Sequence, residues 1–398
     1  MITPLDPSVV KAMVAAHQRY LDGRPGGQRA NFSYKDLHNF IFDGMNLADA
    51  VFSGAMMSGA LFAGANLERA VLFGVDLRNA DLRGANLTRA DLRGACLRGA
   101  NLSLANLTAC DLREGQIALQ DNKNGFRVLK HEKRAGELSY AILTGATLTD
   151  AQMSGVAGTS TDFRDANLNG ASLNGAKLCN AVLDGADLSN AQLSRADLTG
   201  ASLNGACVAG SSIAEARYDK GALATTMGAP PKSVFVDDRP LSDVINEHEL
   251  WVRTDGAQGT FAMASGSDMR VAGVLRGRRL TALRAPKAIF YGMNLEGIEL
   301  QGGDFSGADF RSANLRGADL RGCKLMDALM VRADLRGAKL GPLEIAPGRS
   351  VRTDLTRAVL RLADLTGADA RRARFIEADI EHVKFGDADL TDAEWTPE

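Results

Sequence analysis

Two His-Glu pairs are the residues in this sequence best suited to metal-dependent hydrolysis. They lie at 131–132 and 248–249. The zinc motif H-E-x-x-H places a second histidine three residues after the glutamate, so that both rings lie on one face of a helix. The chain has Ala135 and Val252 at those positions. We therefore predict no metal site and no catalytic pair there.

Other short patterns fail in similar ways. D-N-K-N-G at 121–125 has Lys123 where a calcium loop requires an oxygen ligand, and G-R-P-G-G at 23–27 lacks the Lys-Ser/Thr of a phosphate loop. The five cysteines form no C-x-x-C pair. We predict no catalytic residue, no metal and no cofactor.

Composition excludes further classes of protein. The 398 residues are 45% apolar, enough for one or two large cores, and the net charge of -2 is too small for a polyanion or polycation. No run of about 18 apolar residues occurs, and residues 1–6 lack a signal pattern, so we expect a cytoplasmic protein without membrane contact. Only 6% of residues are aromatic, so base-stacking platforms are scarce and we expect no direct nucleic-acid binding.

A period of five residues dominates the sequence. It is plain at 80–94, which reads ADLRG-ANLTR-ADLRG. With the Leu position as the centre, the centres step by five in three arrays, from Phe32 to Leu112, from Leu138 to Tyr218 and from Leu275 to Trp395. All centres are large and apolar except four: Gly158, Ala285, Ser350 and Ala370.

This period does not fit a helix, because a step of five walks around the helix surface and produces no apolar stripe. In an extended chain, the centre and the residue two before it share one side, and the residues between share the other. This explains why Leu and Ala alternate with Asp, Asn, Arg and Thr. Because five is odd, the backbone must turn a corner in each repeat, and Gly, Asn or Asp commonly stands two residues after the centre.

The motif A-(D/N)-L-x-x resembles that of the pentapeptide-repeat family. The resemblance implies an all-β solenoid, namely a right-handed quadrilateral parallel β-helix with four pentads per coil. It also implies bacterial relatives, among them proteins that dimerise end to end and proteins that protect DNA gyrase by imitating duplex DNA.

Short capping helices are expected to precede the arrays. Asp6-Pro7 followed by apolar residues at helical spacing predicts one helix, and 241–252 predicts a second. His17 precedes Phe32 by the same interval as His248 precedes Met263, so we interpret both histidines as packed cap residues. The expected segments are an N-terminal helical cap (1–29), array 1 (30–114), an insertion (115–135), array 2 (136–220), a loop linker (221–240), a second helical cap (241–262) and array 3 (263–398).

The insertion at 115–135 carries a net charge of +3. Two apolar runs around Asn124-Gly125 predict a β-hairpin. It is either a solvated excursion or a recognition element, since loops on rigid scaffolds often carry function. In the second interpretation the candidate interaction residues are Lys123, Arg127, Lys130, Lys133 and Arg134.

The C-terminal coils are acidic, with a net charge of -7 over 377–398. Only three residues follow the last centre, so we expect a second copy, the first unit or a partner to cover the final coil, and we favour a homodimer through it. The candidate interaction residues here are Glu377, Asp379, Glu381, Asp387, Asp389, Asp392 and Trp395.

Charge argues against imitation of DNA over the whole chain. Duplex DNA carries one negative charge per ~1.7 Å, so a rod of roughly 30 to 40 Å would need on the order of 20 net negative charges. Arginines interrupt the Asp rows, and 276–287 is basic, with a net charge of +5. The sequence therefore favours a non-enzymatic protein–protein interaction scaffold. The alternative is a DNA-mimicking protein that binds and protects a topoisomerase through the acidic coils. A third hypothesis is an enzyme or ligand-binding protein with a site at the junction of the two units.

Overall fold

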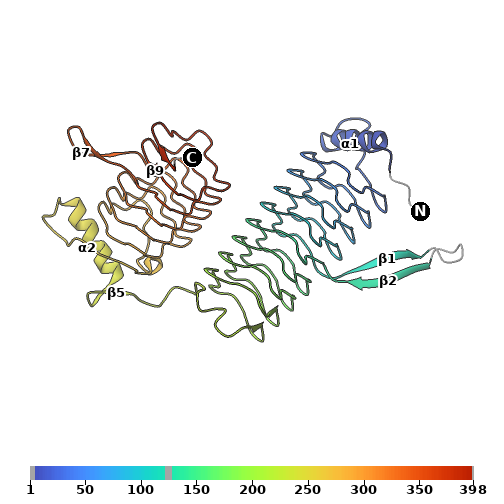
Figure 1. Cartoon of the computed structure of the whole chain (residues 1–398), viewed down its shortest axis with the longest axis horizontal. Helices are drawn as coiled ribbons and strands as arrows, with labels where there is room; N and C mark the ends of the chain where they lie inside the picture. Colours follow the sequence, from blue (N-terminus) through green and yellow to red (C-terminus); the bar gives the residue numbers. More distant parts are fainter. Residues whose placement is uncertain (1–4, 122–127, 397–398) are drawn as a thin grey trace. The chain divides into compact units, whose positions relative to one another are not determined.

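The chain forms two coiled units, each preceded by a helix and each with its own hydrophobic core (Figure 1). Unit 1 is Met1–Ala229 and unit 2 is Pro230–Glu398. The computed structural model describes residues 5–121 and 128–396, with the backbone alone for 116–121 and 128–134.

Helix α1 spans Pro7–Leu21 and confirms the first predicted cap. The Asp6 carboxylate accepts a hydrogen bond from the amide of Ser8 at 2.7 Å, which satisfies one of the free donors at the helix start. Gly23 ends the segment with φ +65°, a left-handed conformation that glycine adopts without strain. Val10 packs on the start of the coil and is fully buried.

The coils confirm the right-handed, four-sided parallel β-helix. Parallel bridges join positions four pentads apart on every side of unit 1, at Asn31↔Val51, Asp36↔Met56, Ile41↔Leu61 and Asn46↔Asn66. The pentad places its centre and the residue two before it inside, as with Leu92 and Ala90, both buried. The residue two after the centre turns the corner with positive φ, including residues such as Leu104 (φ +62°) for which that conformation is strained.

The core of unit 1 runs without a break from the cap to the last coils. In the first coils every second centre is a phenylalanine that stacks on the one four pentads away, with Phe42 and Phe62 at 4.8 Å between ring centroids. In later coils leucine fills the same position. Stacked aromatic rings and packed leucine side chains therefore fill the interior at the same position of successive coils.

Strands β1 (Gly115–Asp121) and β2 (Val128–Arg134) leave the coil of unit 1 as an antiparallel hairpin (Figure 1). The register runs from Gly115↔Arg134 to Asp121↔Val128, and the turn expected at Asn124-Gly125 lies outside the described residues. Beneath the hairpin the coil closes directly, since Cys96 bridges Glu137. Arrays 1 and 2 are therefore one continuous solenoid.

The segment 221–240 is not the plain loop that the sequence suggested. Cys207 bridges Met227, so the coil of unit 1 continues beyond Tyr218, and Ala222 and Leu223 pack against the core. Strands β5 (Phe235–Val236) and β6 (Arg239–Pro240) then pair antiparallel just before the second helix. The continued coil keeps the pentad spacing as far as Met227, but Gly228 stands where the next large apolar centre would lie, and β5 and β6 carry no pentad pattern.

Helix α2 spans Leu241–Arg253 and confirms the second cap. The spacing from His248 makes Met263 the counterpart of the centre Phe32, and this is wrong by one residue: Met263 points outward with 57% exposure, whereas Ala264 is fully buried. The reason is that Met263 bridges Arg284, so it occupies the outward position next to the centre, as Asn31 does in unit 1. The short helix η2, Met269–Val271, follows in the first coil.

Array 3 also contains a hairpin that the sequence did not indicate. Strands β7 (Leu343–Ala346) and β8 (Arg349–Val351) pair antiparallel and leave the coil (Figure 1). Lys324 bridges Asp354, where an uninterrupted coil would have brought Glu344. The expected centres Ile345 and Ser350 therefore lie in an excursion and are exposed. The insertion equals two whole pentads, so the spacing continues in phase across it.

The remaining named strands are two-residue parallel pairs at the ends of the solenoids. They are β3 (Asp197–Leu198) with β4 (Arg217–Tyr218) and β9 (Arg374–Phe375) with β10 (Glu394–Trp395). Among the described residues, no helix has the length and apolar content needed to span a membrane.

Candidate interaction surfaces

Ion pairs within single pentads neutralise much of the outer surface. An aspartate just before the centre and an arginine just after it share the outward side, and the arginine binds the carboxylate with two nitrogens. In unit 1, Arg83 Nε and Nη2 lie 2.8 and 2.6 Å from the Asp81 oxygens. These hydrogen bonds lower the pKa of Asp81. The same arrangement occurs at 76–78, 91–93, 111–113, 162–164, 268–270, 309–311, 319–321, 334–336 and 369–371.

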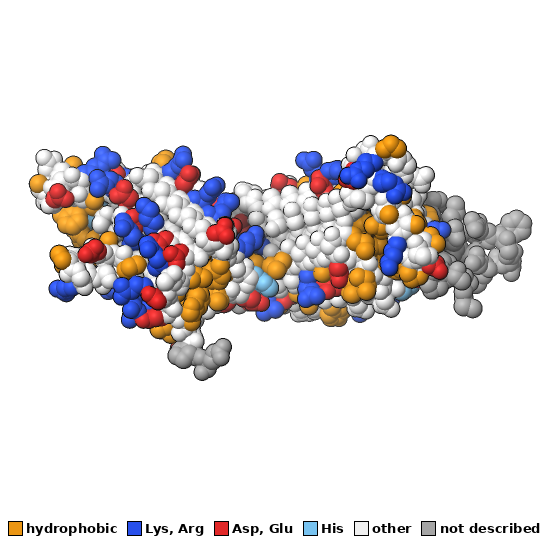
Figure 2. Space-filling model, turned by 90° about the horizontal axis from the view of Figure 1, so that it is seen from above, with side chains coloured by type: hydrophobic (Ala, Val, Ile, Leu, Met, Phe, Trp, Pro, Cys, Tyr) orange, Lys and Arg blue, Asp and Glu red, His pale blue; other side chains and the backbone are white. Residues whose placement is uncertain are grey.

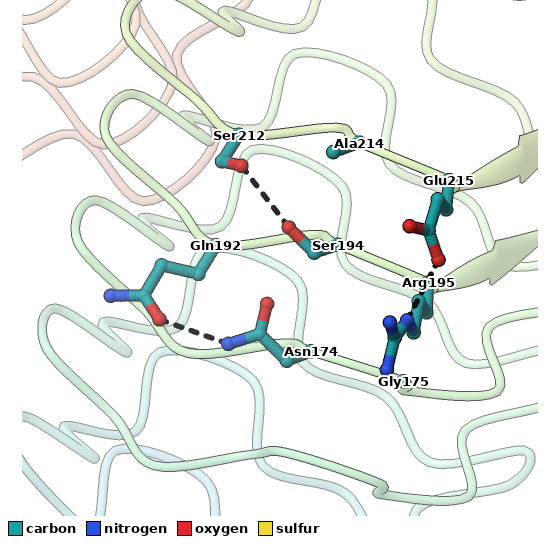
Figure 3. A pocket seen from close by; sticks show the side chains of 8 residues that line it. All are labelled: Asn174, Gly175, Gln192, Ser194, Arg195, Ser212, Ala214 and Glu215. Atoms are coloured by element: carbon teal, nitrogen blue, oxygen red, sulfur yellow. Dashed lines mark hydrogen bonds and ion pairs between the residues drawn. The ribbon is translucent and has the colours of Figure 1, made fainter.

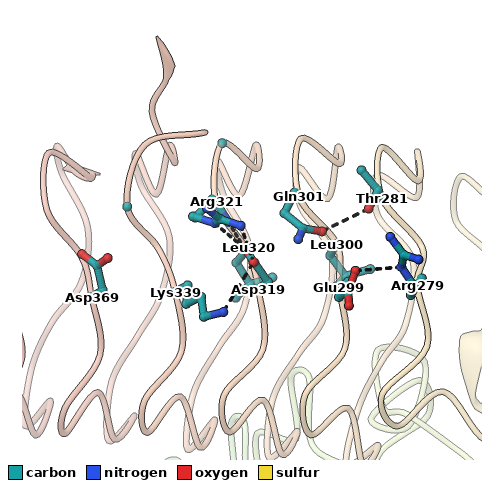
Figure 4. Close-up of polar contacts among 12 residues, drawn as sticks. Arg279, Thr281, Glu299, Leu300, Gln301, Asp319, Leu320, Arg321, Lys339 and Asp369 are labelled. Carbon is teal, nitrogen blue, oxygen red and sulfur yellow. Dashed lines mark hydrogen bonds and ion pairs between the residues drawn. The ribbon is translucent and has the colours of Figure 1, made fainter. Parts of the chain in front are cut away.

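One face of unit 2 shows how charges are also paired between coils (Figure 4). Arg279 contacts Glu299 at 3.1 Å, and Lys339 lies 3.9 Å from Asp319, which Arg321 already binds. Figure 2 shows acidic and basic side chains interspersed over the exposed surface. Such mixed faces lack the one-signed field that a DNA mimic requires.

The basic segment 276–287 is largely paired inside unit 2. Arg278 binds Glu249 of α2 at 2.8 Å, and Arg276 binds Glu296 at 3.1 Å. The guanidinium carbon of Arg284 lies over the ring of Phe261, 5.6 Å from the ring centroid. Arg276, Arg278 and Arg284 therefore each have a partner within unit 2.

The predicted acidic residues of the C-terminal coils surround the solenoid and do not form a strip along it. By the pentad register Glu377, Asp387 and Asp392 lie at three different corners, whereas Asp379 and Glu381 share one face. Asp389 belongs to another face, because it bridges Asp369.

Arginines from preceding coils neutralise part of this set. Asp379 binds Arg361 at 2.6 Å, and Asp389 lies 3.6 Å from Arg371. Glu394, which the candidate set omitted, binds both Arg352 and Arg374, and these contacts lower its pKa. Among residues 5–121 and 128–396, the corner residues Glu377, Asp387 and Asp392 form no ion pair.

Trp395 lies on the last described coil. Its ring stacks on Phe375 at 4.7 Å and meets the edge of Phe385 at 6.1 Å. It is still 39% exposed, and Phe385 and Leu390 beside it are only partly buried, whereas Phe375 one coil earlier is buried. The apolar interior of unit 2 is therefore partly accessible at this coil.

The hairpin residues can be placed only in part. Lys130, Lys133 and Arg134 lie on β2, paired in register with β1. Lys123 and Arg127 lie outside the described residues. The backbone register brings the three described basic residues onto one ribbon, which belongs to unit 1, whereas the acidic candidates belong to unit 2.

An uncharged polar face in array 2 is a feature that the sequence analysis missed. Its outward residues are Asn, Gln, Ser and Ala, and they line a shallow hollow of about 780 Å³ (Figure 3). Asn174 Nδ2 donates to Gln192 Oε1 at 2.9 Å, and the hydroxyls of Ser194 and Ser212 lie 3.1 Å apart. The ion pair of Arg195 with Glu215 stands at its edge. Comparing positions four pentads apart in the sequence would have revealed this face.

Asparagines form a second polar row on unit 1. Asn66 Nδ2 donates to Asn46 Oδ1, and Asn86 Nδ2 donates to Asn66 Oδ1, both at 3.0 Å. The side-chain amides of these three coils therefore form a hydrogen-bonded ladder. Asn106, the fourth member, instead accepts from Thr108 at 2.6 Å.

Four of the cysteines and the histidines of the two caps are buried, and the side chains at 131–132 lie outside the described part of the chain. Among the described residues, no group of three or more His, Cys, Asp or Glu could hold a metal ion. Burial raises the pKa of the Cys323 thiol to about 12, and it also raises that of Cys110, so both thiols stay protonated at neutral pH. His17 and His248 are fully buried in the caps.

The comparisons with known proteins agree with this fold. The family model for pentapeptide repeats matches more than half of the chain, at residues 30–69, 58–89, 85–116, 161–200, 176–212, 288–327 and 353–392. A search of curated proteins by sequence finds no significant match.

Several solved structures are similar. Full-length QnrB1, a plasmid-mediated fluoroquinolone resistance protein, is 17% identical over 50% of this chain and 95% of its own, with a TM-score of 0.25. HetL of Nostoc sp. strain PCC 7120, involved in the regulation of heterocyst differentiation, is 18% identical over 94% and 93%, with a TM-score of 0.16. Rfr23 of Cyanothece 51142 is 26% identical over 38% and 90%, with a TM-score of 0.12. At these TM-scores the superpositions carry no argument about function.

Proposed function

The chain belongs to the pentapeptide-repeat family, and from this premise we propose that it is a non-enzymatic scaffold that binds another protein. The observation that carries the proposal is the filling of the coils. In both units the inward positions hold mainly apolar side chains, and outside the end coils these are buried almost completely. An enzyme needs a concave site with convergent polar groups. The surfaces of these units that a partner can contact are therefore the outward-facing side chains of the coils and the hairpins.

The hairpin β1–β2 is our first choice for the binding element. It leaves a continuous solenoid that closes beneath it, so the coil does not need it for its own pairing. Its basic residues favour a partner with an acidic surface. Lys123, Arg127, Lys130, Lys133 and Arg134 are the residues that we propose make this contact.

The last described coil of unit 2 is a second candidate. Trp395 with the partly buried Phe385 and Leu390 gives it an apolar centre, and Asp387 and Asp392 supply charges without an ion pair among the described residues. An aromatic centre with a charged rim is a common composition for a binding site. We propose this coil as the homodimer surface. Light scattering at high concentration tests it, and a particle of about 42.2 kDa would refute it.

Affinity capture from the native cell tests the scaffold. The bait is the full chain, and the matched variant lacks residues 117–133. We expect a protein that the full chain retains and the deletion variant loses, while circular dichroism shows that the variant is folded. Capture of the same proteins by both baits would refute the role of the hairpin. A cytoplasmic location is part of this proposal, and fractionation of the native cell tests it.

The competing hypothesis is a DNA mimic that binds and protects DNA gyrase through the acidic coils. The ring-like arrangement of these residues and the pairs of Asp379 and Asp389 with arginines disfavour it. A supercoiling assay distinguishes the two. The scaffold hypothesis expects no effect on gyrase at micromolar protein. Inhibition that disappears when Asp387, Asp389 and Asp392 are all replaced by Lys would support the mimic.

A further inference from the structure

The two caps hold a buried histidine in the same way. His17 on α1 and His248 on α2 are both fully buried. Each ring lies nearly parallel to an aromatic ring three residues later, His17 on Tyr20 at 5.8 Å and His248 on Trp251 at 5.7 Å. The helices are otherwise different in sequence, so the repeated geometry points to a shared task.

That task is to accept a hydrogen bond from the first unpaired backbone amide of the solenoid in each unit. His17 Nδ1 accepts from the amide of Ala30 at 3.1 Å, and His248 Nδ1 accepts from the amide of Ala262 at 3.1 Å. In later pentads the corresponding amide donates to the carbonyl three residues earlier, as Ala50 does to Leu47. Ala30 and Ala262 have no pentad before them, so the imidazole replaces the missing carbonyl.

The bond requires an imidazole without a proton on Nδ1. The proton of the neutral ring then lies on Nε2, which in His248 donates to the carbonyl of Thr281 at 3.2 Å. His17 Nε2 has no hydrogen-bond partner among the described residues. A second proton would place the Nδ1–H of either ring against a backbone N–H, and an imidazolium has no ring nitrogen left to accept that amide.

The surroundings of His17 favour the neutral ring. Burial lowers the pKa of His17, and Arg29 lowers it further, whereas the Ala48 carbonyl and Asp49 act in the opposite direction. Asp49 is itself bound by Arg69.

The surroundings of His248 also favour the neutral ring. Burial lowers the pKa of His248, against the carbonyls of Thr281 and Leu280. The aromatic rings of Trp251 and Phe261 face it, and the neighbouring Glu249 is bound by Arg278 and Arg253.

We propose that each cap is a proton-operated latch: protonation of His17 or His248 releases its helix from the first coil and exposes the open edge of that coil. The direction of the pH dependence follows because the hydrogen bond requires the neutral imidazole. The stability that the latch contributes is complete above the unfolded-state pKa of 6.5 and is lost as the pH falls below it. An open edge of paired backbone is a template for another chain, so mild acid would promote association at the cap ends.

Hydrogen exchange of the full chain between pH 8 and pH 5, corrected for intrinsic rates, tests the latch. We expect exchange in α1 and α2 to rise by up to about tenfold per pH unit below about 6.5, while the coils stay protected. Trp251 fluorescence in a Trp395→Phe background reports α2 independently, because the chain has two tryptophans.

The matched variants are His17→Asn and His248→Asn. Asparagine places Oδ1 where Nδ1 lies, so it accepts the same amide at every pH and does not titrate. Each substitution should remove the pH dependence of its own helix and leave that of the other. Persistence of the dependence in the substituted helix would overturn the proposal.

Should a variant fold poorly, NMR titration of the wild-type imidazoles decides. We expect both to titrate below 6.5 and helix exchange to follow the same curves. Titration of the rings without any change in helix exchange would also overturn the latch.

Discussion

The insertions of the two units differ in length, and the difference shows what periodicity can detect. In unit 1, Cys96 bridges Glu137, where an uninterrupted coil would have brought Gln116, so the hairpin adds four whole pentads and one further residue. In unit 2, Lys324 bridges Asp354 instead of Glu344, so the hairpin adds two whole pentads. The first insertion shifts the pentad phase by one residue and breaks the pattern. The second keeps the phase, so the sequence runs on as if the chain had never left the coil.

The described contacts of β7–β8 tie that hairpin to its coil. In unit 2 the side chain of Leu343 lies over the corner glycines Gly302 and Gly322. The hydroxyl of Thr353, where the chain returns, accepts from the amide of Gly322 at 3.0 Å. In unit 1 the coil passes beneath the hairpin with its regular bridges. The β7–β8 hairpin is therefore bound into its coil, whereas we propose that β1–β2, without which its coil still pairs, binds a partner.

Truncating a core phenylalanine should give the largest effect and should test whether the units are independent. Phe305→Ala in unit 2 removes a buried ring between Phe290 and Phe310 and should lower the free energy of unfolding of that unit by about 3–5 kcal/mol. Phe62→Ala is the matched change in unit 1. Tryptophan fluorescence reports unit 2 only, since Trp251 and Trp395 both belong to it. A fluorescence transition shifted equally by both variants would mean one cooperative body.

Filling a corner glycine should have an intermediate effect and should probe the packing of β7–β8. A Cβ at Gly322 would lie 2.7 Å from the Leu343 Cβ, whereas one at Gly317 meets nothing within 4 Å. Both residues have positive φ, +68° and +61°. We expect Gly317→Ala to cost about 1–2 kcal/mol from backbone strain alone. Gly322→Ala should cost about 1–3 kcal/mol more. Equal urea midpoints for the two variants would show that the hairpin does not lie there.

Removing a paired carboxylate should have the smallest effect on the free energy of unfolding, and this effect should disappear in acid. Burial raises the pKa of Asp319, but the hydrogen bonds from Arg321 outweigh it, so the pKa lies below the usual 3.8. The pair therefore contributes above about pH 3.8 and is lost as the pH falls. Asp319→Asn should cost about 1 kcal/mol at pH 7. Asp162→Asn is the matched variant in unit 1, where Arg164 has the same role. A loss that is unchanged well below pH 3.8 would exclude the ion pair as its cause.

The sequence predicts the local repeat well and long-range geometry poorly. The alternation of Leu and Ala with polar residues dictates which side chains face inward, and Asp6-Pro7 dictates where α1 begins. The start of array 3 was misplaced by one residue, and the excursion at Ile345 was missed. A five-residue period shows where an apolar centre would fall, but it does not show whether that residue belongs to a coil or to an insertion. The uncharged face at Asn174 was missed because it exists only when every fourth pentad is stacked.

The candidate site residues illustrate the same limit. The acidic residues of 377–394 are close in the sequence, yet the coil distributes them around its circumference and brings arginines from earlier coils beside Asp379 and Asp389. Pairing of Glu394 with Arg352 depends on where β8 returns to the coil, which no local pattern encodes.

The most direct test of the scaffold proposal is quantitative affinity capture from the native cell with three baits: the full chain, the chain without 117–133, and the chain with Asp387, Asp389 and Asp392 replaced by Lys. We expect a protein that is enriched by the full chain and by the triple substitution and is lost with the hairpin deletion. If a topoisomerase is enriched by the full chain and the hairpin deletion and is lost with the triple substitution, the scaffold assignment is contradicted.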